Sequence, residues 1–444
     1  MKVLVAPLLL VATVAMAGPF DAIDGMVDRW QASGAFSGAI VVKQGDAVLY
    51  ERAAGWADPE RRMPFTATTP TDGASLAKPF TALLVLMLVR EGRIDLEAPV
   101  TRYVAEYPHG ETRVRHLLAH SAGLPDYDAF DPLFKSGMPV TTSAMLRDLA
   151  ARHTAPAFVP GTRFAYCNLC LDTLAVVVER VTGASFEAVL RARIWRPAGI
   201  ANAYVRPARL DAFPPGRATG HRWRNGRSEP YDAEDNEGFH GGSNVYASAR
   251  EFARFGAAFA DRVPWLGAAG RDALAPVRLA GDATTGITLG GWYCDASLKR
   301  CYYTGHHRGY YSVLYWNSEL RTTVAWVCNS TLPLTLRSTL ERALVAAAEG
   351  RPPPPAPLAR AALDDARLAS LAGDHEIEGV GRVRVSVDGA HATLRSPTGV
   401  DYALVRVTPQ SLYAPGVDAR IGTTTDGRLI WSSVFGEATG SRAR

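Results

Sequence analysis

The 444-residue sequence contains only five lysines, so its basic side chains are almost all arginines. Its formal charge at pH 7 is +4, from 48 basic and 44 acidic residues. So small an excess of positive charge does not favour a nucleic acid or another strongly anionic partner. The sequence also lacks an internal repeat, which argues against a repeat architecture, and its N-terminal apolar run is too short to give a stable membrane span.

That apolar run belongs to a predicted secretory signal at residues 1–17. Lys2 precedes the run from Val3 to Val14, and Ala15-Met16-Ala17 is typical of a small-x-small cleavage site. A run of this length does not cross a bilayer, so it does not indicate a membrane anchor. We therefore expect an exported protein, periplasmic or secreted, in an oxidising compartment.

Cysteine is scarce, with five residues in the chain. Cys167 lies close to Cys170, and Cys294 lies close to Cys301, whereas Cys328 is left over. This spacing predicts two short-loop disulfides, the second of which would staple a hairpin. A Cys-x-x-Cys pair is also typical of redox and zinc sites. Because no second Cys-x-x-Cys completes a zinc set, we expect no metal.

The length and the hydrophobic content of 47% predict a large core and more than one domain. Strand patterns at residues 38–51 precede a mostly helical middle, and further strand patterns follow it. One sheet assembled from both ends and covered by helices is therefore expected within residues 18–350. The proline-rich segment 351–357 predicts a stiff linker, and the alternating pattern over 358–444 predicts a small all-β domain.

The most informative stretch runs from Asp72 to Thr81 and leads into an apolar helix. Pro79 is tolerated only in the first turn of a helix, so the helix starts close to Ser75. Residues three apart share a helix face, so the Lys78 amine can reach the Ser75 hydroxyl. The positive end of the helix dipole would lie under the forming alkoxide. The spacing favours a serine nucleophile with a lysine base, and a structural helix cap is the alternative.

Four ordered blocks stand out along the chain: Ser75–Thr81, His116–Tyr127, Pro160–Asn168 and Gly241–Phe255. With these blocks, the chain from about residue 35 to residue 347 resembles the serine β-lactamase-like superfamily. The resemblance is to the branch with class C β-lactamases, D,D-carboxypeptidases, D-amino-acid peptidases and related esterases. It implies an α/β (α+β) fold, in which helices flank an antiparallel sheet beside a helical subdomain, and a serine hydrolase without metal or cofactor. The short segment Leu371–Glu376 resembles lipocalin-like C-terminal β-modules of some peptidase members.

The resemblance also implies roles for single residues. Ser75 would attack a carbonyl carbon and form an acyl-enzyme. Lys78 and Tyr166 would share the general-base work, and Asn168 would orient Lys78 and the substrate amide. A surface tyrosine packed on a loop is the alternative for Tyr166. A disulfide between Cys167 and Cys170 would make the loop that carries Tyr166 more rigid.

The third motif departs from the family pattern. β-Lactamases carry Lys-Thr-Gly on the strand beside the nucleophile, and no lysine of this sequence can serve there. Gly305-His306-His307-Arg308-Gly309 occupies the place, and related peptidases and esterases often have His-x-Gly. We favour His307-Arg308-Gly309 as the triplet because it puts a glycine where the strand approaches the substrate, and His306 as the histidine is the other register. The oxyanion donors would then be the backbone N–H groups of Ser75 and Tyr310.

The sequence therefore predicts an exported serine hydrolase that cleaves an amide or ester in a small molecule or peptide. A peptidoglycan-derived peptide, a β-lactam or an ester would be the substrate. The missing third-motif lysine favours a peptidase or esterase. One alternative is a class C-like β-lactamase in which Arg308 holds the substrate carboxylate bidentately. The other is a penicillin-recognising sensor or binding module with little turnover. Substrate choice would depend on the predicted loops at 128–139 and 214–242.

Overall fold

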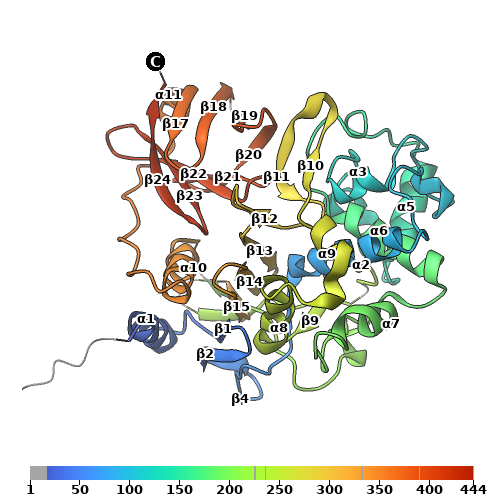
Figure 1. Ribbon diagram of the computed structural model, residues 1–444, viewed down its shortest axis with the longest axis horizontal. Coiled ribbons are helices and arrows are strands. Elements are labelled where there is room, and N and C mark those ends of the chain that lie inside the picture. Colours follow the sequence, from blue (N-terminus) through green and yellow to red (C-terminus); the bar gives the residue numbers. More distant parts are fainter. Residues whose placement is uncertain (1–17, 225–226, 236, 332–333, 390, 444) are drawn as a thin grey trace, which may run out of the picture.

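The computed structural model describes residues 18–224, 227–235, 237–331, 334–389 and 391–443. The predicted signal at residues 1–17 lies outside these ranges. The described chain forms a sheet flanked by helices and a β-barrel that lies over one end of it (Figure 1). Within the described ranges, no helix combines the length and the apolar character that a bilayer crossing requires.

An eight-stranded sheet forms the centre of the first part, in the order β10-β11-β12-β13-β14-β15-β1-β2. The N-terminal hairpin of β1 (Gly38–Gln44) and β2 (Ala47–Ala54) joins the later strands where β1 pairs antiparallel with β15 (Thr322–Cys328). The predicted assembly of one sheet from both ends of the domain is confirmed. The other strands are β10 (Pro276–Arg278), β11 (Thr284–Thr288), β12 (Tyr293–Cys294), β13 (Arg300–His307) and β14 (Tyr310–Asn317).

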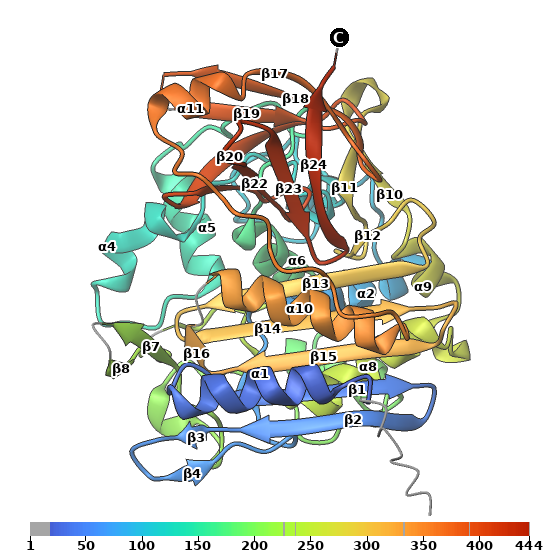
Figure 2. The ribbon, with the colours of Figure 1, turned by 90° about the vertical axis from the view of Figure 1, so that its left-hand side faces the viewer.

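Helices cover both faces of this sheet (Figure 2). The first face carries α1 (Asp21–Ala32) and α10 (Leu334–Ala348), and the other carries α8 (Ala249–Ala260), which packs on β14, β15 and β1. At the start of α8, Ser248 and Glu251 form a capping box in which each side chain accepts the other's backbone N–H. Because helices lie on both faces of the sheet, strands β14 and β15 are buried along their whole length.

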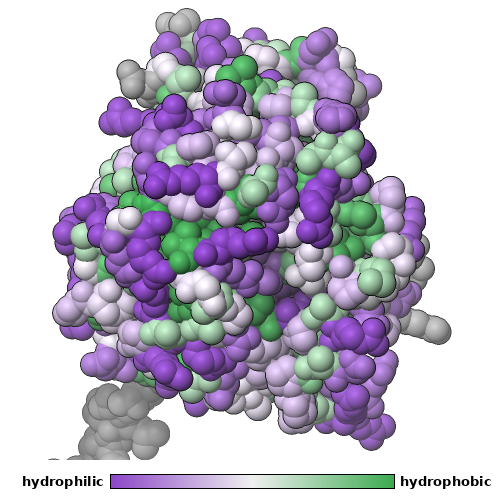
Figure 3. Space-filling model, turned by 90° about the vertical axis from the view of Figure 1, so that its right-hand side faces the viewer, coloured by the Kyte–Doolittle hydropathy of each residue, from purple (hydrophilic) through white to green (hydrophobic). Residues whose placement is uncertain are grey.

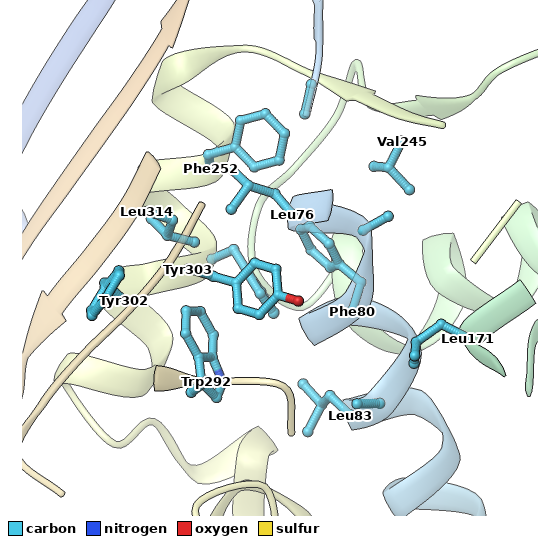
Figure 4. Packing of buried hydrophobic residues seen from close by; sticks show 14 of the residues in the cluster. Leu76, Phe80, Leu83, Leu171, Val245, Phe252, Trp292, Tyr302, Tyr303 and Leu314 are labelled. Atoms are coloured by element: carbon cyan, nitrogen blue, oxygen red, sulfur yellow. The ribbon is translucent and has the colours of Figure 1, made fainter. Parts of the chain in front are cut away.

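The predicted nucleophile helix packs against α8. It consists of a single 3₁₀ turn, η1 (Ala74–Leu76), followed by α2 (Ala77–Arg90). The ring of Phe80 stacks on Phe255 of α8 at 3.9 Å between centroids, and Leu76 and Phe252 lie beside it (Figure 4). Because α2 is buried on almost all sides, the start of this helix is held rigidly against β13 and β14.

The helical middle packs against the nucleophile helix, since α6 (Asn168–Thr182) contacts α2. Its longest helix, α6, ends at Gly183, whose φ of +70° is the left-handed cap expected of glycine. Its other helices are α3 (Val114–Leu118), α4 (Asp131–Phe134), α5 (Thr142–Ala151), α7 (Phe186–Leu190) and α9 (Gly267–Asp272). Short strands in the first part are β3 (Trp56–Asp58), β4 (Met63–Pro64), β5 (Thr71–Asp72), β6 (Tyr204–Val205) and β9 (Val245–Ala247).

The prediction of a long loop over residues 214–242 is wrong for residues 221–230. Strands β7 (His221–Arg224) and β8 (Arg227–Pro230) form a hairpin there, and β7 pairs in parallel with β16 (Ser330–Thr331). Both strands consist mostly of polar residues, so they lack the apolar and polar alternation that indicates a half-buried strand.

The C-terminal part is a closed antiparallel barrel of eight strands with a hydrophobic core of its own, which confirms the predicted small all-β domain. The helix α11 (Asp365–Ser370) precedes it. The strands are β17 (Gly373–Ile377), β18 (Gly381–Asp388), β19 (His391–Arg395), β20 (Asp401–Thr408), β21 (Ser411–Ala414), β22 (Ala419–Thr423), β23 (Leu429–Ser433) and β24 (Gly436–Arg442).

The barrel is seated on the first part by apolar and hydrogen-bonded contacts. The Tyr402 ring meets Phe164 edge-on at 5.4 Å, and its hydroxyl accepts the Gly286 N–H at 3.0 Å. The Tyr293 hydroxyl donates to the Pro415 carbonyl at 2.6 Å. Seen from one side, hydrophobic side chains gather at mid-height below the barrel, on a face that is otherwise largely hydrophilic (Figure 3). The two parts therefore share a packed interface.

The helix–sheet contact predicts opposite effects of one substitution at two helical glycines. A Cβ on Gly256 of α8 would lie 2.7 Å from Thr323 Cγ2 and 2.8 Å from Leu314 Cδ1, whereas a Cβ on Gly25 of α1 meets only Arg29 Nη1 at 3.4 Å. Gly25→Ala should raise the free energy of unfolding by about 0.5–1 kcal/mol through helix propensity. Gly256→Ala should lower it by about 1–3 kcal/mol through overpacking. Urea unfolding of both variants checks this, and equal shifts would contradict it.

Candidate active site

The turn that carries Ser75 is fixed by side chains on either side of it. Ala74 has a φ of +48°, a left-handed conformation that is strained for a residue with a Cβ. Asp72 Oδ1 accepts the Ala74 N–H at 2.8 Å, and Ser312 Oγ donates to the Gly73 carbonyl at 2.7 Å. The strained turn is therefore held from its own loop and from β14.

Lys78 is fully buried and has an acceptor for each of its three donors. Its Nζ lies 2.9 Å from Ser75 Oγ, 2.8 Å from Asn168 Oδ1 and 2.6 Å from the Gly242 carbonyl oxygen. An ammonium group offers three N–H donors, so this set satisfies it completely. The structure thus brings together Ser75, Lys78 and Asn168, three of the residues that the sequence singled out.

Tyr166 completes the group around Ser75. Its hydroxyl lies 3.0 Å from Ser75 Oγ, and its ring centroid lies 4.8 Å from Lys78 Nζ. The ring stacks on the imidazole of His120 at 4.9 Å, and His120 Nδ1 accepts the Cys167 N–H at 3.0 Å. Burial, with the nearby charge of Lys78, lowers the pKa of His120 to about 3, so this imidazole is neutral near pH 7. The His120 ring fixes the orientation of the Tyr166 ring.

Both expected cysteine pairs are disulfides in the structure. Cys167 bonds to Cys170 at the start of α6, between Tyr166 and the body of the helix, and Cys294 bonds to Cys301 across β12 and β13. Cys328 is buried and free. Among the described residues, no cluster of three or more His, Cys, Asp or Glu side chains could hold a metal ion.

A second layer of polar side chains orients the groups around Lys78. Asn168 Nδ2 donates to the Asp126 carboxylate at 3.1 and 3.2 Å, which turns Asn168 Oδ1 toward Lys78. Asp172 accepts the Gly242 N–H at 2.7 Å and the Tyr127 hydroxyl at 2.6 Å. None of these three residues, Asp126, Tyr127 and Asp172, was predicted from the sequence to act at the site. Asp126 and Tyr127 lie in the family-like block His116–Tyr127, and this position could have indicated a role at the site. No local sequence pattern distinguishes Asp172.

The structure places a different part of β13 beside Ser75 from the triplet that the sequence favoured. A Cβ on Gly305 would lie 2.2 Å from the Gly73 oxygen and 3.0 Å from the Ser75 nitrogen, so this glycine is where β13 meets the nucleophile turn. The triplet beside Ser75 is therefore Tyr303-Thr304-Gly305. The hydroxyl of Tyr303 lies 3.2 Å from that of Tyr166, and Figure 4 shows it directed toward the helix that carries Phe80.

His307 and Arg308 serve other contacts. His307 Nδ1 lies 2.9 Å from Asp72 Oδ2, so His307 supports the Ser75 turn from behind. Arg308 forms ion pairs with Glu234 and Glu237. The physical reason is that β13 continues to His307, and the hairpin turns only at Arg308, with a φ of +50°.

The remaining third-motif residues are also placed differently from the preferred register. Gly309 packs against the backbone of His221, where a Cβ would lie 2.2 Å from the nitrogen. Tyr310 begins β14 opposite His307, and its hydroxyl donates to the Ala218 carbonyl at 3.0 Å. His306 lines the cavity that contains Ser75. Burial, with nearby positive charge, lowers the pKa of His306 to about 4.

Ser75 opens into a cavity of about 600 Å³ between the two parts of the protein. The first part supplies Tyr166, Tyr303 and the segment around Phe164, and the barrel supplies residues of β20 and of the β21–β22 region. Aromatic rings make up much of the wall. A cavity of this size and lining suits a small organic molecule or a short peptide.

Comparisons with known proteins find similar sequences and similar folds. Penicillin-binding protein 4* of Bacillus subtilis (strain 168) is 27% identical over 291 residues, which are 62% of this chain and 63% of that protein. Esterase EstB of Burkholderia gladioli is 33% identical over 235 residues, 48% of this chain and 58% of that protein. Each match spans less than two thirds of the relative's own length.

The similarity in fold includes the barrel. The structure of the octameric penicillin-binding protein homologue from Pyrococcus abyssi matches with a TM-score of 0.64 and 21% identity, covering 94% of this chain and 98% of that one. A family model described as Beta-lactamase matches residues 23–349, which is most of the chain. On these grounds the chain belongs to the Beta-lactamase family.

Proposed function

We propose that the protein is an exported serine hydrolase that cleaves an ester or amide bond through a Ser75 acyl-enzyme. The observation that carries this proposal is the contact of Ser75 Oγ with both Lys78 Nζ, at 2.9 Å, and the Tyr166 hydroxyl, at 3.0 Å. A hydroxyl held between an amine and a phenol is an activated nucleophile. The names of the similar proteins, a penicillin-binding protein and an esterase, support hydrolysis. The two disulfides support export.

In the proposed acylation Tyr166 acts as a phenolate, which accepts the Ser75 proton while Oγ attacks the substrate carbonyl carbon and the C=O electron pair moves to the carbonyl oxygen. The ammonium group of Lys78 stabilises the negative charge on the attacking oxygen, and the Tyr303 hydroxyl can donate to the Tyr166 oxygen. The oxyanion would be bound by the backbone N–H groups of Ser75 and of the β13 residue that follows Gly305. Tyr166 then returns the proton to the leaving group.

Hydrolysis of the acyl-enzyme would reuse the same groups. A water molecule replaces the leaving group, Tyr166 accepts its proton, and the oxygen of Ser75 leaves with that proton. His120 keeps the Tyr166 ring in place through both halves of the cycle, since the two rings are stacked. Only a base that stays within hydrogen-bond reach of both nucleophiles can serve twice.

A peptidase or an esterase fits the site better than a β-lactamase. Tyr303 stands where β-lactamases carry the lysine of their third motif, and a neutral phenol does not replace an ammonium group as a partner of the β-lactam carboxylate. Arg308, the cation that the sequence offered instead, is held by Glu234 and Glu237. The proposal is therefore an ester or a peptide-like amide as substrate.

Asp172 is a positioning residue whose buried negative charge lowers the stability of the folded state. Its carboxylate holds the Gly242 N–H and thereby places the Gly242 carbonyl for Lys78. Burial raises the pKa of Asp172 to about 6, although hydrogen bonds from Tyr127 and Gly242 oppose the shift. Because this pKa lies above the unfolded value near 3.9, the folded state binds the extra proton between about pH 4 and 6. Stability from this group therefore falls as the pH rises through that window.

Substitutions at Ser75 and Tyr166 test the proposed mechanism. Ser75→Ala should abolish labelling by a fluorescent fluorophosphonate and turnover of p-nitrophenyl acetate, because the attacking oxygen is gone. Tyr166→Phe should lower kcat/KM for the ester by about 10²–10⁴-fold, the usual effect of losing a general base. Tyr50→Phe, which removes a phenol hydroxyl bonded to Asp24 at 2.7 Å, is the matched control and should retain the wild-type rate.

The same proteins separate the alternatives. Rapid turnover of the ester with slow turnover of nitrocefin supports the proposal, whereas the reverse order identifies a β-lactamase. A penicillin label that forms and then persists on wild type identifies a sensor with little turnover. Unchanged labelling of Ser75→Ala would remove Ser75 from the mechanism altogether.

The pH dependence of stability tests the role of Asp172. Asp172→Asn should unfold at higher urea than wild type at pH 8, with a gain of about 1–3 kcal/mol, because no charge is buried. The gain should shrink as the pH falls to 4, where the wild-type carboxyl is protonated. Ester hydrolysis by Asp172→Asn should slow, since an amide holds the Gly242 N–H less strongly than a carboxylate does. The exposed Asp131→Asn is the control, and a gain in stability that does not change with pH would contradict the assignment.

A further inference from the structure

We propose that the C-terminal barrel forms the leaving-group side of the active site and that Asp418 makes this side reject leaving groups that carry a carboxylate. The inference rests on the proposed acyl-enzyme function. The expected substrates are esters or amides whose departing alcohol or amine is neutral and aromatic or otherwise apolar. The barrel would then determine specificity directly, since it forms part of the wall that contacts the substrate.

The position of Tyr166 identifies the side of the cavity that receives the leaving group. In the proposed mechanism this phenol returns its proton to the departing atom, so that atom must lie within hydrogen-bond distance of the Tyr166 oxygen. Tyr166 lines the same cavity as Tyr402, Val405 and Tyr413, which the barrel supplies. Whatever is attached to the departing atom therefore extends from Ser75 toward the barrel.

The rings on this side offer apolar faces because their polar ends are already bonded. The Tyr293 hydroxyl donates to the Pro415 carbonyl, and the Tyr402 hydroxyl accepts the Gly286 N–H. Phe164 stands edge-on to Tyr402 at the same wall. Aromatic faces of this kind accept flat or apolar groups well and offer no hydrogen-bond donor to a carboxylate.

Asp418 brings a carboxylate from the barrel to the catalytic strand. It lies in the turn between β21 and β22 with a φ of +44°, a conformation that Asp tolerates better than most residues, and its exposed fraction is 8%. Its Oδ1 accepts the Tyr413 hydroxyl at 2.6 Å, and its Oδ2 lies 3.4 Å from Thr304 Oγ1. Thr304 is the middle residue of the triplet beside Ser75. The carboxylate therefore lies directly behind Tyr413 and Thr304, two residues that line the cavity.

Asp418 lies one side chain behind the cavity wall and acts on the cavity through the Tyr413 and Thr304 hydroxyls, whose hydrogens are donated to it. Arg420 of β22 is bonded to Ser338 Oγ at 2.9 Å and lies 4.0 Å from Glu341, and its positive charge interacts with both Glu341 and Asp418. Because the pKa of His306 is about 4, that imidazole is neutral near pH 7. A carboxylate that approaches this part of the wall would be desolvated near a charge of the same sign, which is unfavourable.

The rim of the cavity carries charges of both signs. Arg163 is exposed there, with its guanidinium 5.6 Å from the Phe158 ring, and the carboxylates of Asp126 and Asp401 lie on the same lining. Exposed charges are screened by water and salt, so Arg163 influences approach more than binding near Tyr413 and Thr304. Arg163 is nevertheless the group that would favour a leaving group with a carboxylate. A variant of Arg163 is therefore part of the test.

Two acetate esters that share an acyl group and differ in leaving-group charge test the proposal. The leaving group of 4-acetoxybenzoate is a phenol that carries a carboxylate. The leaving group of its methyl ester is the corresponding phenol without a charge. Both give the same acetyl-enzyme, so their kcat/KM ratio reports acylation alone. Wild type should prefer the methyl ester by about tenfold or more, the size expected for one unfavourable charge interaction. Asp418→Asn should lower that ratio by about fivefold or more, because the side-chain shape is kept and the charge removed.

The control variants separate the possible failures. Asp426→Asn removes an exposed carboxylate elsewhere on the barrel and should leave the ratio at the wild-type value. Equal kcat/KM values for the two esters in wild type, or an unchanged ratio in Asp418→Asn, would overturn the inference while the proposed function stands. A preference for the anionic ester that Arg163→Gln abolishes would also overturn it. Absence of an acetyl-enzyme from either ester would instead overturn the proposed function.

Discussion

The site depends on one constraint, the burial of the Lys78 amine with all three donors bonded. Burying an ammonium group costs several kcal/mol unless each donor finds an acceptor. Ser75 lies in η1, Asn168 at the start of α6 and Gly242 in the segment before β9, so the three acceptors come from separate parts of the chain. The charge can be buried only when these segments have assembled, and their assembly also creates the nucleophile.

Around this centre, each reactive group is held by a further contact that takes no part in the chemistry. Tyr166 is fixed by His120, Asn168 by Asp126, and Gly242 by Asp172. Such support keeps reacting atoms within the narrow range of geometry that catalysis needs. The cost is visible at Asp172, whose carboxylate is buried and carries a raised pKa. The contacts that hold the reactive groups in place therefore lower the stability of the folded state to some extent.

The sequence predicted what is local or carried by ordered motifs. The spacing of Ser75 and Lys78 is a property of one helix turn, and the sheet pairing of β1 with β15 follows from strand patterns at both ends of the domain. The third-motif register could not be predicted, because the polar pair His306 and His307 resembles a turn, although β13 continues through it. The approach of Asp418 to Thr304 depends on how the barrel is seated, which no local pattern encodes.

The most direct test of the central claim is the rate at which an acetyl adduct forms on the peptide that contains Ser75. Quenched-flow mass spectrometry with p-nitrophenyl acetate measures this rate in wild type and in Lys78→Met, whose apolar side chain fills the buried site without a charge. The account predicts a Ser75 adduct in wild type and acylation slowed by at least about a hundredfold in a folded Lys78→Met. Acylation of Lys78→Met at the wild-type rate, or an adduct on another residue, would contradict it.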